Sequence, residues 1–343
     1  MYSFRNDYSE IAHKNILDAL SKYASEQNVG YGLDSHSSNA RKLIRKQIDR
    51  DIDVDVRFLI GGTSCNKIVI SHVLRPFEAV IAATTGHINV HEAGAIEASG
   101  HKVITVPSHN GKLLPADITK VVHEHVDEHM VVPKMVYISN ATETGSIYTK
   151  AELTAISKVC HVHNLILYVD GARLGAALTA IGNDLTINDI AQLTDLFYIG
   201  GTKNGTLFGE ALVIVNDDLK NNFRHSIKQN GGMLAKGFIT GIQFEALFTD
   251  DLFFKLAKHA NEVANILKNK LTDLNVEFFA SSSTNQQFIN LDNNIITRLL
   301  EKYDFEIWNK GNTSSAIRLV TSWATPIEAV DEFINDLKAI LNK

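Results

Sequence analysis

Two short apolar runs of this chain are the starting point, because each has the pattern of a buried strand. Each is also followed by a residue that can take part in chemistry. Leu165–Val169 leads into Asp170, and Leu196–Ile199 leads through two glycines into Thr202–Lys203. Both runs are rich in β-formers and bounded by turn residues, which is typical of buried strands. Open α/β sheets bind ligands at the carboxyl ends of their strands. We therefore expect an acid and an amine on the same edge of a sheet.

This pairing favours pyridoxal phosphate as a cofactor. The cofactor needs a lysine amine for its aldehyde and an acid beside its pyridine nitrogen, which keeps the ring an electron sink. Lys203 would be the amine and Asp170 the acid. Taken singly, Asp170 could instead cap the helix that follows it, and Lys203 could be a solvated loop lysine. Only the combination of the two favours the cofactor.

The segments around these two residues resemble a known family. Val169–Leu174 (Val-Asp-Gly-Ala-Arg-Leu) and Gly200–Gly205 (Gly-Gly-Thr-Lys-Asn-Gly) resemble the threonine aldolase, or β-eliminating lyase, branch of the pyridoxal phosphate enzymes. The resemblance covers nearly the whole chain and implies an aspartate aminotransferase-like α/β fold. Strands and helices alternate through the first two thirds of the sequence, which independently predicts a doubly wound, mostly parallel sheet.

Length and composition narrow the class of protein. The 343 residues suffice for two domains, and the net charge of −6 without a basic stripe argues against a nucleic-acid partner. No apolar run reaches the ~20 residues of a membrane span, so we expect no membrane partner. Two cysteines are too few for a disulfide framework, and the N-terminus lacks a signal-peptide pattern. A cytoplasmic location is the simplest expectation.

A candidate phosphate seat follows the predicted strand Asp55–Ile60. Small residues, Gly61–Asn66, lead from it into a helix, and free N–H groups at a helix start bind anions. An ordinary glycine-rich turn is the alternative, and no Walker motif is present. The resemblance assigns Gly62 and Thr63 to the cofactor phosphate, with Thr202 as a further hydroxyl donor.

Two histidines and a glutamate follow the next predicted strand. His87 and His91 stand four residues apart and would share one helix face. A zinc protease would need glutamate where Ile88 stands, so we predict no metal. The resemblance implies that His87 stacks on the cofactor ring, although a histidine bonded locally at a helix start is the alternative. The catalytic base is left open among His87, His91, Glu92 and a water that they hold.

Two further segments contain candidate site residues. His125–His129 spells an inverted zinc-protease pattern, but it precedes Pro133 closely and has no third ligand, so we expect a solvated face. Asn140 ends the predicted strand Lys134–Ser139, and the resemblance assigns it to the cofactor site. Many relatives carry a histidine where Thr142 stands, which leaves recognition of the substrate hydroxyl in doubt.

The substrate carboxylate has three candidate partners by resemblance: Arg173, Arg318 and Asn6. A guanidinium matches a carboxylate with two parallel hydrogen bonds. Arg318 lies in an apolar strand, where it requires an anion or an internal ion pair. Tyr31, in a polar N-terminal loop, is also expected to contact substrate.

These features together predict an aldehyde-lyase with residues 1–249 as the cofactor-binding domain and 250–343 as a smaller α+β domain. The predicted reaction is retro-aldol cleavage of β-hydroxy-α-amino acids, L-threonine and L-allo-threonine first, into glycine and an aldehyde. Another pyridoxal phosphate lyase is the alternative within the class, and a nucleotide-binding protein using Gly61–Thr63 is the alternative outside it. The basic turn 224–236 suggests a homo-oligomer, a dimer of dimers, in which one subunit completes its neighbour's site.

Overall fold

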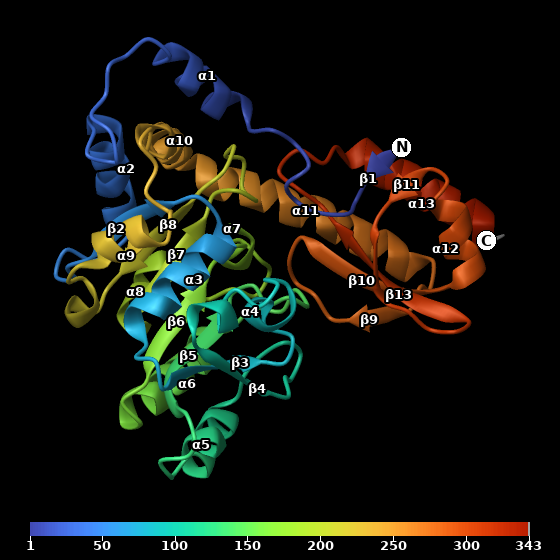
Figure 1. Ribbon diagram of the computed structural model, residues 1–343. Helices are drawn as coiled ribbons and strands as arrows, with labels where there is room; N and C mark the ends of the chain where they lie inside the picture. The colour runs from blue at the N-terminus through green and yellow to red at the C-terminus, as the bar shows by residue number, and fades with distance from the viewer. Residues whose placement is uncertain (342–343) are drawn as a thin grey trace.

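The computed structural model describes residues 1–341 and confirms an α/β fold around a seven-stranded sheet of order β2-β8-β7-β6-β5-β3-β4 (Figure 1). Strands β7, β6, β5, β3 and β4 run parallel, and β8 pairs antiparallel with β2 and β7. The strands are β2 (Asp55–Leu59), β3 (Glu78–Ala83), β4 (Lys102–Val106), β5 (Val132–Ser139), β6 (Ile166–Asp170), β7 (Leu196–Gly200) and β8 (Glu210–Ile214).

Helices cover both faces of this sheet, because successive strand residues point to opposite sides. In β6, Leu167 and Val169 pack on one face and Tyr168 on the other. The first face is covered by α1 (Lys14–Lys22), α2 (Ser35–Arg45), α5 (Pro115–Glu124), α6 (Lys150–Val162), α8 (Ile187–Leu193) and α10 (Phe238–Leu247). The second face is covered by α3 (Gly62–Val73), α4 (His87–Val90) and α9 (Phe223–Gln229).

Helix α2 begins at Ser35, inside a polar segment of the chain. The Asp34 carboxylate accepts a hydrogen bond of 2.7 Å from the backbone N–H of Ser37 and so caps the helix start. A side-chain cap thus outweighs the polar composition of this segment.

The C-terminal part forms a smaller α+β unit, which the long helix α11 (Leu252–Asp273) joins to the large sheet (Figure 1). Its antiparallel sheet has the order β12-β13-β10-β9. The strands are β9 (Phe278–Ala280), β10 (Gln286–Asp292), β12 (Glu306–Asn309) and β13 (Ser314–Val320), and the helices are α12 (Asn293–Leu299) and α13 (Ile327–Leu341). Short 3-10 turns lie at Glu97–Ser99, Asp217–Leu219 and Thr249–Asp251.

The first residues of the chain pack with this C-terminal unit rather than with the large sheet. Strand β1 (Tyr2–Ser3) pairs with β11 (Tyr303–Asp304), and Phe4 is buried in the C-terminal core. The prediction places residues 1–249 in one domain. In the structure, the buried Phe4 side chain packs the N-terminus against the C-terminal unit. Within the described part of the chain, none of the helices is long and apolar enough to cross a membrane.

Candidate active site

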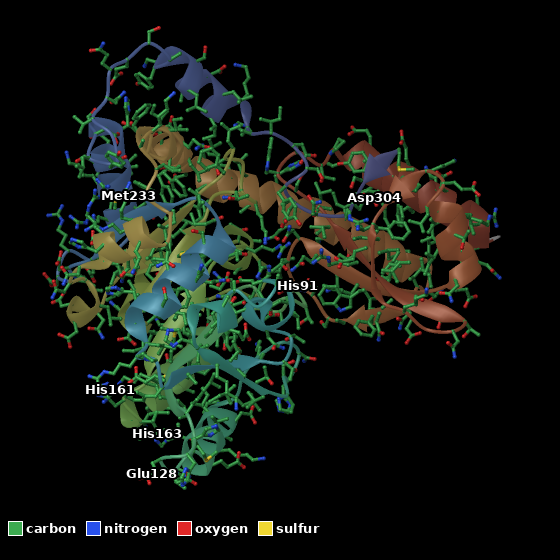
Figure 2. All side chains as sticks on the ribbon, in the orientation of Figure 1. His91, Glu128, His161, His163, Met233 and Asp304 are labelled. Carbon is green, nitrogen blue, oxygen red and sulfur yellow. The ribbon has the colours of Figure 1, made fainter. Side chains whose placement is uncertain are left out.

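Two cavities, of about 350 and about 290 Å³, meet between the large sheet and the C-terminal unit. Figure 2 places His91, which lines the larger cavity, at this junction. Five residues line both cavities: Tyr8, His87, Glu143, Arg173 and Lys203. Asp170 lines the smaller cavity from the carboxyl end of β6. The structure therefore brings the predicted acid and amine to one site.

Asp170 is buried and receives hydrogen bonds on both oxygens. The Tyr198 hydroxyl donates to Oδ1 and the Tyr137 hydroxyl to Oδ2, each at 2.5 Å. Burial raises the pKa of Asp170, but the charge of His87 and the two tyrosine hydroxyls outweigh it, so the pKa lies below its ordinary value. The N–H of Ala172 also donates to Oδ1 at 3.0 Å, but the following helix α7 (Leu174–Leu178) has Arg173 at its N-cap and no side-chain cap, so Asp170 does not cap it.

Neither tyrosine was predicted as a site residue, although the sequence carries a signal for both. A tyrosine precedes Ile or Val near the end of three strands, at Tyr137 in β5, Tyr168 in β6 and Tyr198 in β7. Because the side-chain period of a strand is two, all three lie on the same face of the sheet. The hydroxyls of Tyr137 and Tyr198 therefore lie beside the Asp170 carboxylate, at the carboxyl end of β6, and donate to it.

Lys203 follows β7 and is half-buried among charged groups. Burial and the positive charge of Arg173 lower the pKa of its amine. A lower pKa leaves more of the amine neutral and nucleophilic. The neighbouring Thr202 lines the smaller cavity, and its hydroxyl donates to Oε1 of Glu210, another residue of that lining, at 2.8 Å. The assignment of Thr202 to the cofactor phosphate stays a prediction.

His87 is oriented by a buried carboxylate. Its Nδ1 lies 2.8 Å from Oε1 of Glu92, which also accepts a hydrogen bond of 2.7 Å from Asn66 Nδ2. The Glu92 side chain is wholly buried and lines neither cavity. Glu92 therefore fixes the His87 ring and cannot reach a substrate proton, which removes it from the predicted bases. The His91 ring lies 5.4 Å from that of His87.

The two predicted carboxylate-binding arginines both line the larger cavity and both carry internal ion pairs. Arg173 holds Asp7 with Nε–Oδ2 at 2.7 Å and Nη2–Oδ1 at 3.0 Å. Arg318 Nη2 lies 2.5 Å from Oε2 of Glu306, and its guanidinium lies 5.2 Å from the Trp308 ring centre. Asp7, Glu306 and Trp308 were not predicted.

The segment after β5 differs from the expectation. Thr142 is buried, and its hydroxyl lies 2.8 Å from that of Ser146, so it does not face either cavity. Glu143 faces both cavities instead. Asn140 is also buried, and its Oδ1 accepts a hydrogen bond from Tyr148 N at 3.2 Å, so it lies behind the lining. After the end of β5, the side chain of Glu143 therefore faces the cavities, and that of its neighbour Thr142 does not.

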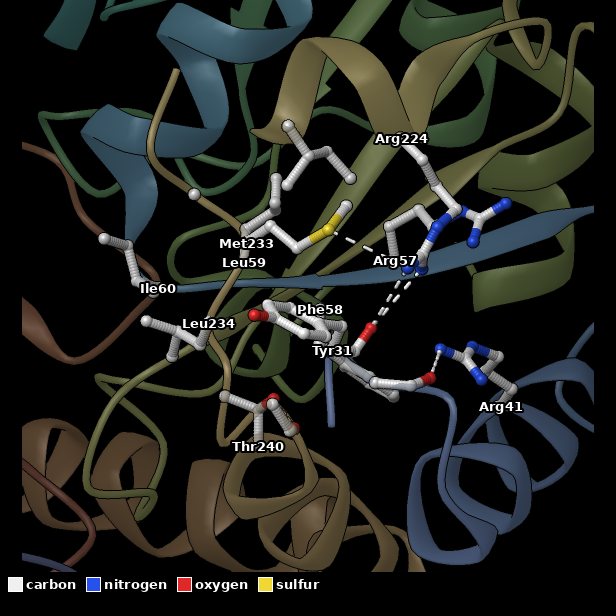
Figure 3. A pocket seen from close by; sticks show the side chains of 14 residues that line it. Tyr31, Arg41, Arg57, Phe58, Leu59, Ile60, Arg224, Met233, Leu234 and Thr240 are labelled. Atoms are coloured by element: carbon white, nitrogen blue, oxygen red, sulfur yellow. Dashed lines mark hydrogen bonds between the residues drawn. The ribbon is translucent and has the colours of Figure 1, made fainter. Parts of the chain in front are cut away.

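Asn6 and Tyr31 are placed differently. Asn6 lines the larger cavity, and its Oδ1 accepts the N–H of Tyr8 at 2.9 Å, leaving its Nδ2 as a donor. Tyr31 lies in a neighbouring pocket, where Arg224 donates to its carbonyl (Figure 3). That pocket shares Ile60 with the smaller cavity, so Tyr31 adjoins the site without lining it.

The predicted phosphate seat belongs to the same site. Gly61, Gly62 and Thr63 line the smaller cavity at the start of the 12-residue helix α3, which has no side-chain cap. A Cβ atom on Gly62 would lie 3.0 Å from the Tyr198 hydroxyl, so glycine keeps the cavity open. The amine, the acid and the anion-binding helix start fit pyridoxal phosphate. In residues 1–341, no group of three or more His, Cys, Asp or Glu side chains is placed to hold a metal.

Comparison with known proteins decides the family. Residues 9–294 match the model of the beta-eliminating lyase family. The chain belongs to this family. The lyase is similar to the low specificity L-threonine aldolases of a Pseudomonas species (31% identical, 94% of this chain and 93% of the relative) and of Pseudomonas aeruginosa (30% identical, 91% and 90%).

Solved structures extend this result. The lyase superposes on a threonine aldolase of Leishmania major with a TM-score of 0.98 and 50% identity, over 99% of this chain and 100% of that one. Cystalysin from Treponema denticola, at 16% identity and a TM-score of 0.72 over 96% and 88%, shares the fold. The enzyme is a pyridoxal phosphate-dependent lyase, and the nucleotide-binding alternative finds no support.

Proposed function

We propose that this lyase cleaves β-hydroxy-α-amino acids between Cα and Cβ, with L-threonine and L-allo-threonine yielding glycine and acetaldehyde. The observation that carries the proposal is the junction of the two cavities, where Lys203, Arg173 and His87 meet. The 50% identity to a threonine aldolase over the whole chain supports it. Lyases of this family that eliminate a β-substituent are the second candidate, because they need the same amine and acid.

Four groups of this chain would hold the cofactor. Lys203 would bind its aldehyde, Asp170 its pyridine nitrogen, and the start of α3 at Gly62 and Thr63 its phosphate. His87, fixed by Glu92, would lie against its ring. When bound, pyridoxal phosphate supplies the electron sink that takes up the electron pair of the broken Cα–Cβ bond. Because Asp170 is held ionised, it would keep the pyridine nitrogen protonated.

The substrate carboxylate would be held by Arg173, Arg318 and Asn6. Asp7 occupies Nε and one Nη of Arg173, so it orients the guanidinium and leaves the second Nη to the cavity. Arg318 is oriented differently: Glu306 pairs with its Nη2, its Nη1 donates to Oε1 of Gln286 at 3.2 Å, and the guanidinium lies against Trp308. Two oriented cations and an amide donor would fix Cα over the cofactor while the β-substituent points into the larger cavity.

The functional unit would be a dimer, with a dimer of dimers as the full assembly. Tyr31 and Arg224 gather in the pocket beside the phosphate end of the cavity, and the Arg224 guanidinium, which forms no ion pair with a carboxylate of residues 1–341, suits a phosphate. These residues would complete the site of a neighbouring subunit. A cytoplasmic location and a division into domains at residue 249 remain predictions.

Aldehyde release tests the proposal directly. The purified enzyme, loaded with pyridoxal phosphate, is incubated with L-threonine, L-serine and a β-elimination substrate such as L-cysteine. Acetaldehyde from L-threonine is measured by coupled reduction, and pyruvate is measured as the product of β-elimination. Pyruvate from L-cysteine without acetaldehyde from L-threonine would replace the aldolase by the second candidate.

A further inference from the structure

We propose that Glu143 is the general base that removes the β-hydroxyl proton of the substrate. This inference rests on the proposed aldol cleavage. It starts from the position of Glu143 as the only carboxylate among the five residues that line both cavities. The bond to be broken must lie at this junction, because the cofactor amine Lys203 and the carboxylate-binding Arg173 meet there.

Among residues 1–341, none of the other carboxylates near the site lines both cavities, and neither does His91. Glu92 is buried behind His87, and Glu210 lines only the smaller cavity and accepts hydrogen bonds from Thr202 and Gly201. His91 and Glu306 line only the larger cavity, and Glu306 is paired with Arg318.

Hydrogen bonds fix Glu143 in a reactive orientation. Its Oε1 accepts the backbone N–H of His87 at 3.0 Å and the Ser139 hydroxyl at 2.6 Å. Within residues 1–341, Oε2 receives no hydrogen bond from another residue, so it is the oxygen available to a substrate. The anchor through His87 N also ties the carboxylate to the ring expected to lie on the cofactor.

The electrostatic surroundings suit a base. Burial raises the pKa of Glu143, the Ser139 and His87 donors lower it, and the charge of Asp170 raises it further, so that it lies above its ordinary value. A raised pKa strengthens the carboxylate as a proton acceptor. The charged and titratable groups that share its cavities are Arg5, Tyr8, His87, His91, Asp170, Arg173, Tyr198, Lys203, Glu210, Glu306 and Arg318.

The proposed step is balanced. Oε2 of Glu143 forms a bond to the hydroxyl proton, and the O–H electron pair becomes the second bond of the aldehyde C=O. The Cα–Cβ bond breaks, and its electron pair stays with Cα. Glycine forms when Cα takes up a proton, and Glu143 returns its own proton to solvent, so the cycle consumes no net proton.

The experiment compares Glu143→Gln and Glu143→Ala with the wild type and with Glu97→Gln, a control at an exposed position outside both cavities. We expect Glu143→Gln to lower kcat/KM for L-threonine about 10²- to 10⁴-fold, the usual contribution of a general base. Its affinity for glycine, which has no hydroxyl, should stay within about threefold when followed by the visible absorbance of the bound cofactor. The Glu97→Gln enzyme should behave as wild type.

Chemical rescue provides a second readout. Added formate should restore part of the activity of Glu143→Ala, because a small carboxylate can enter the vacated space, whereas chloride should not. The low-pH limb of the wild-type kcat/KM profile should move to lower pH in Glu143→Gln, because the pKa of Asp170 lies below its ordinary value and that of Glu143 above its own. Near-normal cleavage by Glu143→Gln, or loss of cleavage in Glu143→Ala without formate rescue, would overturn the role as base. Neither outcome contradicts the proposed aldol cleavage, provided that the wild type releases acetaldehyde from L-threonine. A wild type that releases no acetaldehyde would contradict the proposed cleavage itself.

Discussion

The Tyr198 hydroxyl donates a hydrogen bond of 2.5 Å to Oδ1 of Asp170 across two adjacent strands. Removing this donor in Tyr198→Phe should raise the pKa of Asp170, because the bond stabilises the ionised carboxylate. We expect a lower kcat with the cofactor retained, and an acidic limb of the kcat profile displaced to higher pH. Measuring kcat against pH checks this. A profile that coincides with wild type would show that Tyr198 only packs the site.

Lys203→Ala should abolish turnover and remove the covalent link to the cofactor. The physical reason is that no other lysine of residues 1–341 lines either cavity. Reduction of the wild type with borohydride, followed by peptide mapping, should label Lys203. A label on any other lysine would contradict the assignment.

Asp7→Asn should destabilise the fold by about 3–5 kcal/mol, because it leaves the buried guanidinium of Arg173 without its counter-charge. Burial raises the pKa of Asp7, but Arg173, Lys203 and Asn285 outweigh it and hold it below its ordinary value. The ionised Asp7 therefore adds stability above its unfolded pKa of about 4, and this is lost as the pH falls through the lower folded value. Urea unfolding at pH 7 and below pH 4 should show the difference between wild type and variant shrinking in acid.

The matched control for this change is Asp304→Asn, which breaks the exposed pair with Arg5. Exposed pairs contribute about 0–1 kcal/mol, so this variant should unfold almost as the wild type does. Equal losses of unfolding free energy in the two variants would mean that the buried Asp7–Arg173 pair stabilises the fold no more than the exposed Arg5–Asp304 pair does.

Cleavage should be strict at Cα and permissive at Cβ. Thr142 is bonded to Ser146 and cannot read the configuration of the β-carbon, whereas the arginines would fix the carboxylate. We expect L-threonine and L-allo-threonine to be cleaved with kcat/KM within about 100-fold, since one hydrogen bond is worth about 1–3 kcal/mol. D-threonine should be inert. Acetaldehyde release from the three isomers measures this, and activity with a single L-epimer would show that another group reads the hydroxyl.

Mixing inactive variants tests the shared site. Arg224→Ala and Lys203→Ala should each be inactive or weak alone, and their mixture after subunit exchange should regain activity. In a mixed dimer, one site would combine an intact Lys203 with the neighbour's intact Arg224. Activity that does not rise on mixing, with exchange verified by mass spectrometry, would place Arg224 in the site of its own chain.

The sequence alone determined the fold class and the central pair of the site. The alternation of apolar strands with helices specifies a parallel sheet, and strand ends are marked by local turn residues. Asp170 and Lys203 each follow such a run directly, so their arrival on one edge follows from the pattern. Short-range rules of this kind also indicated an anion seat at the turn Gly61–Asn66, whereas the roles of Gly62, Thr63 and His87 came from the family resemblance.

Tertiary structure decided which side chains complete the site. The contacts of Asp170 with Tyr137 and of Arg173 with Asp7 join residues far apart in the chain, so even the repeated strand-end tyrosines do not tell which carboxylate a hydroxyl reaches. Whether Thr142 or Glu143 faces the cavity depends on the backbone path after β5, where a shift of one residue exchanges inside for outside. These choices follow from close packing of the whole chain, which fixes side-chain direction only after the strands and helices have assembled.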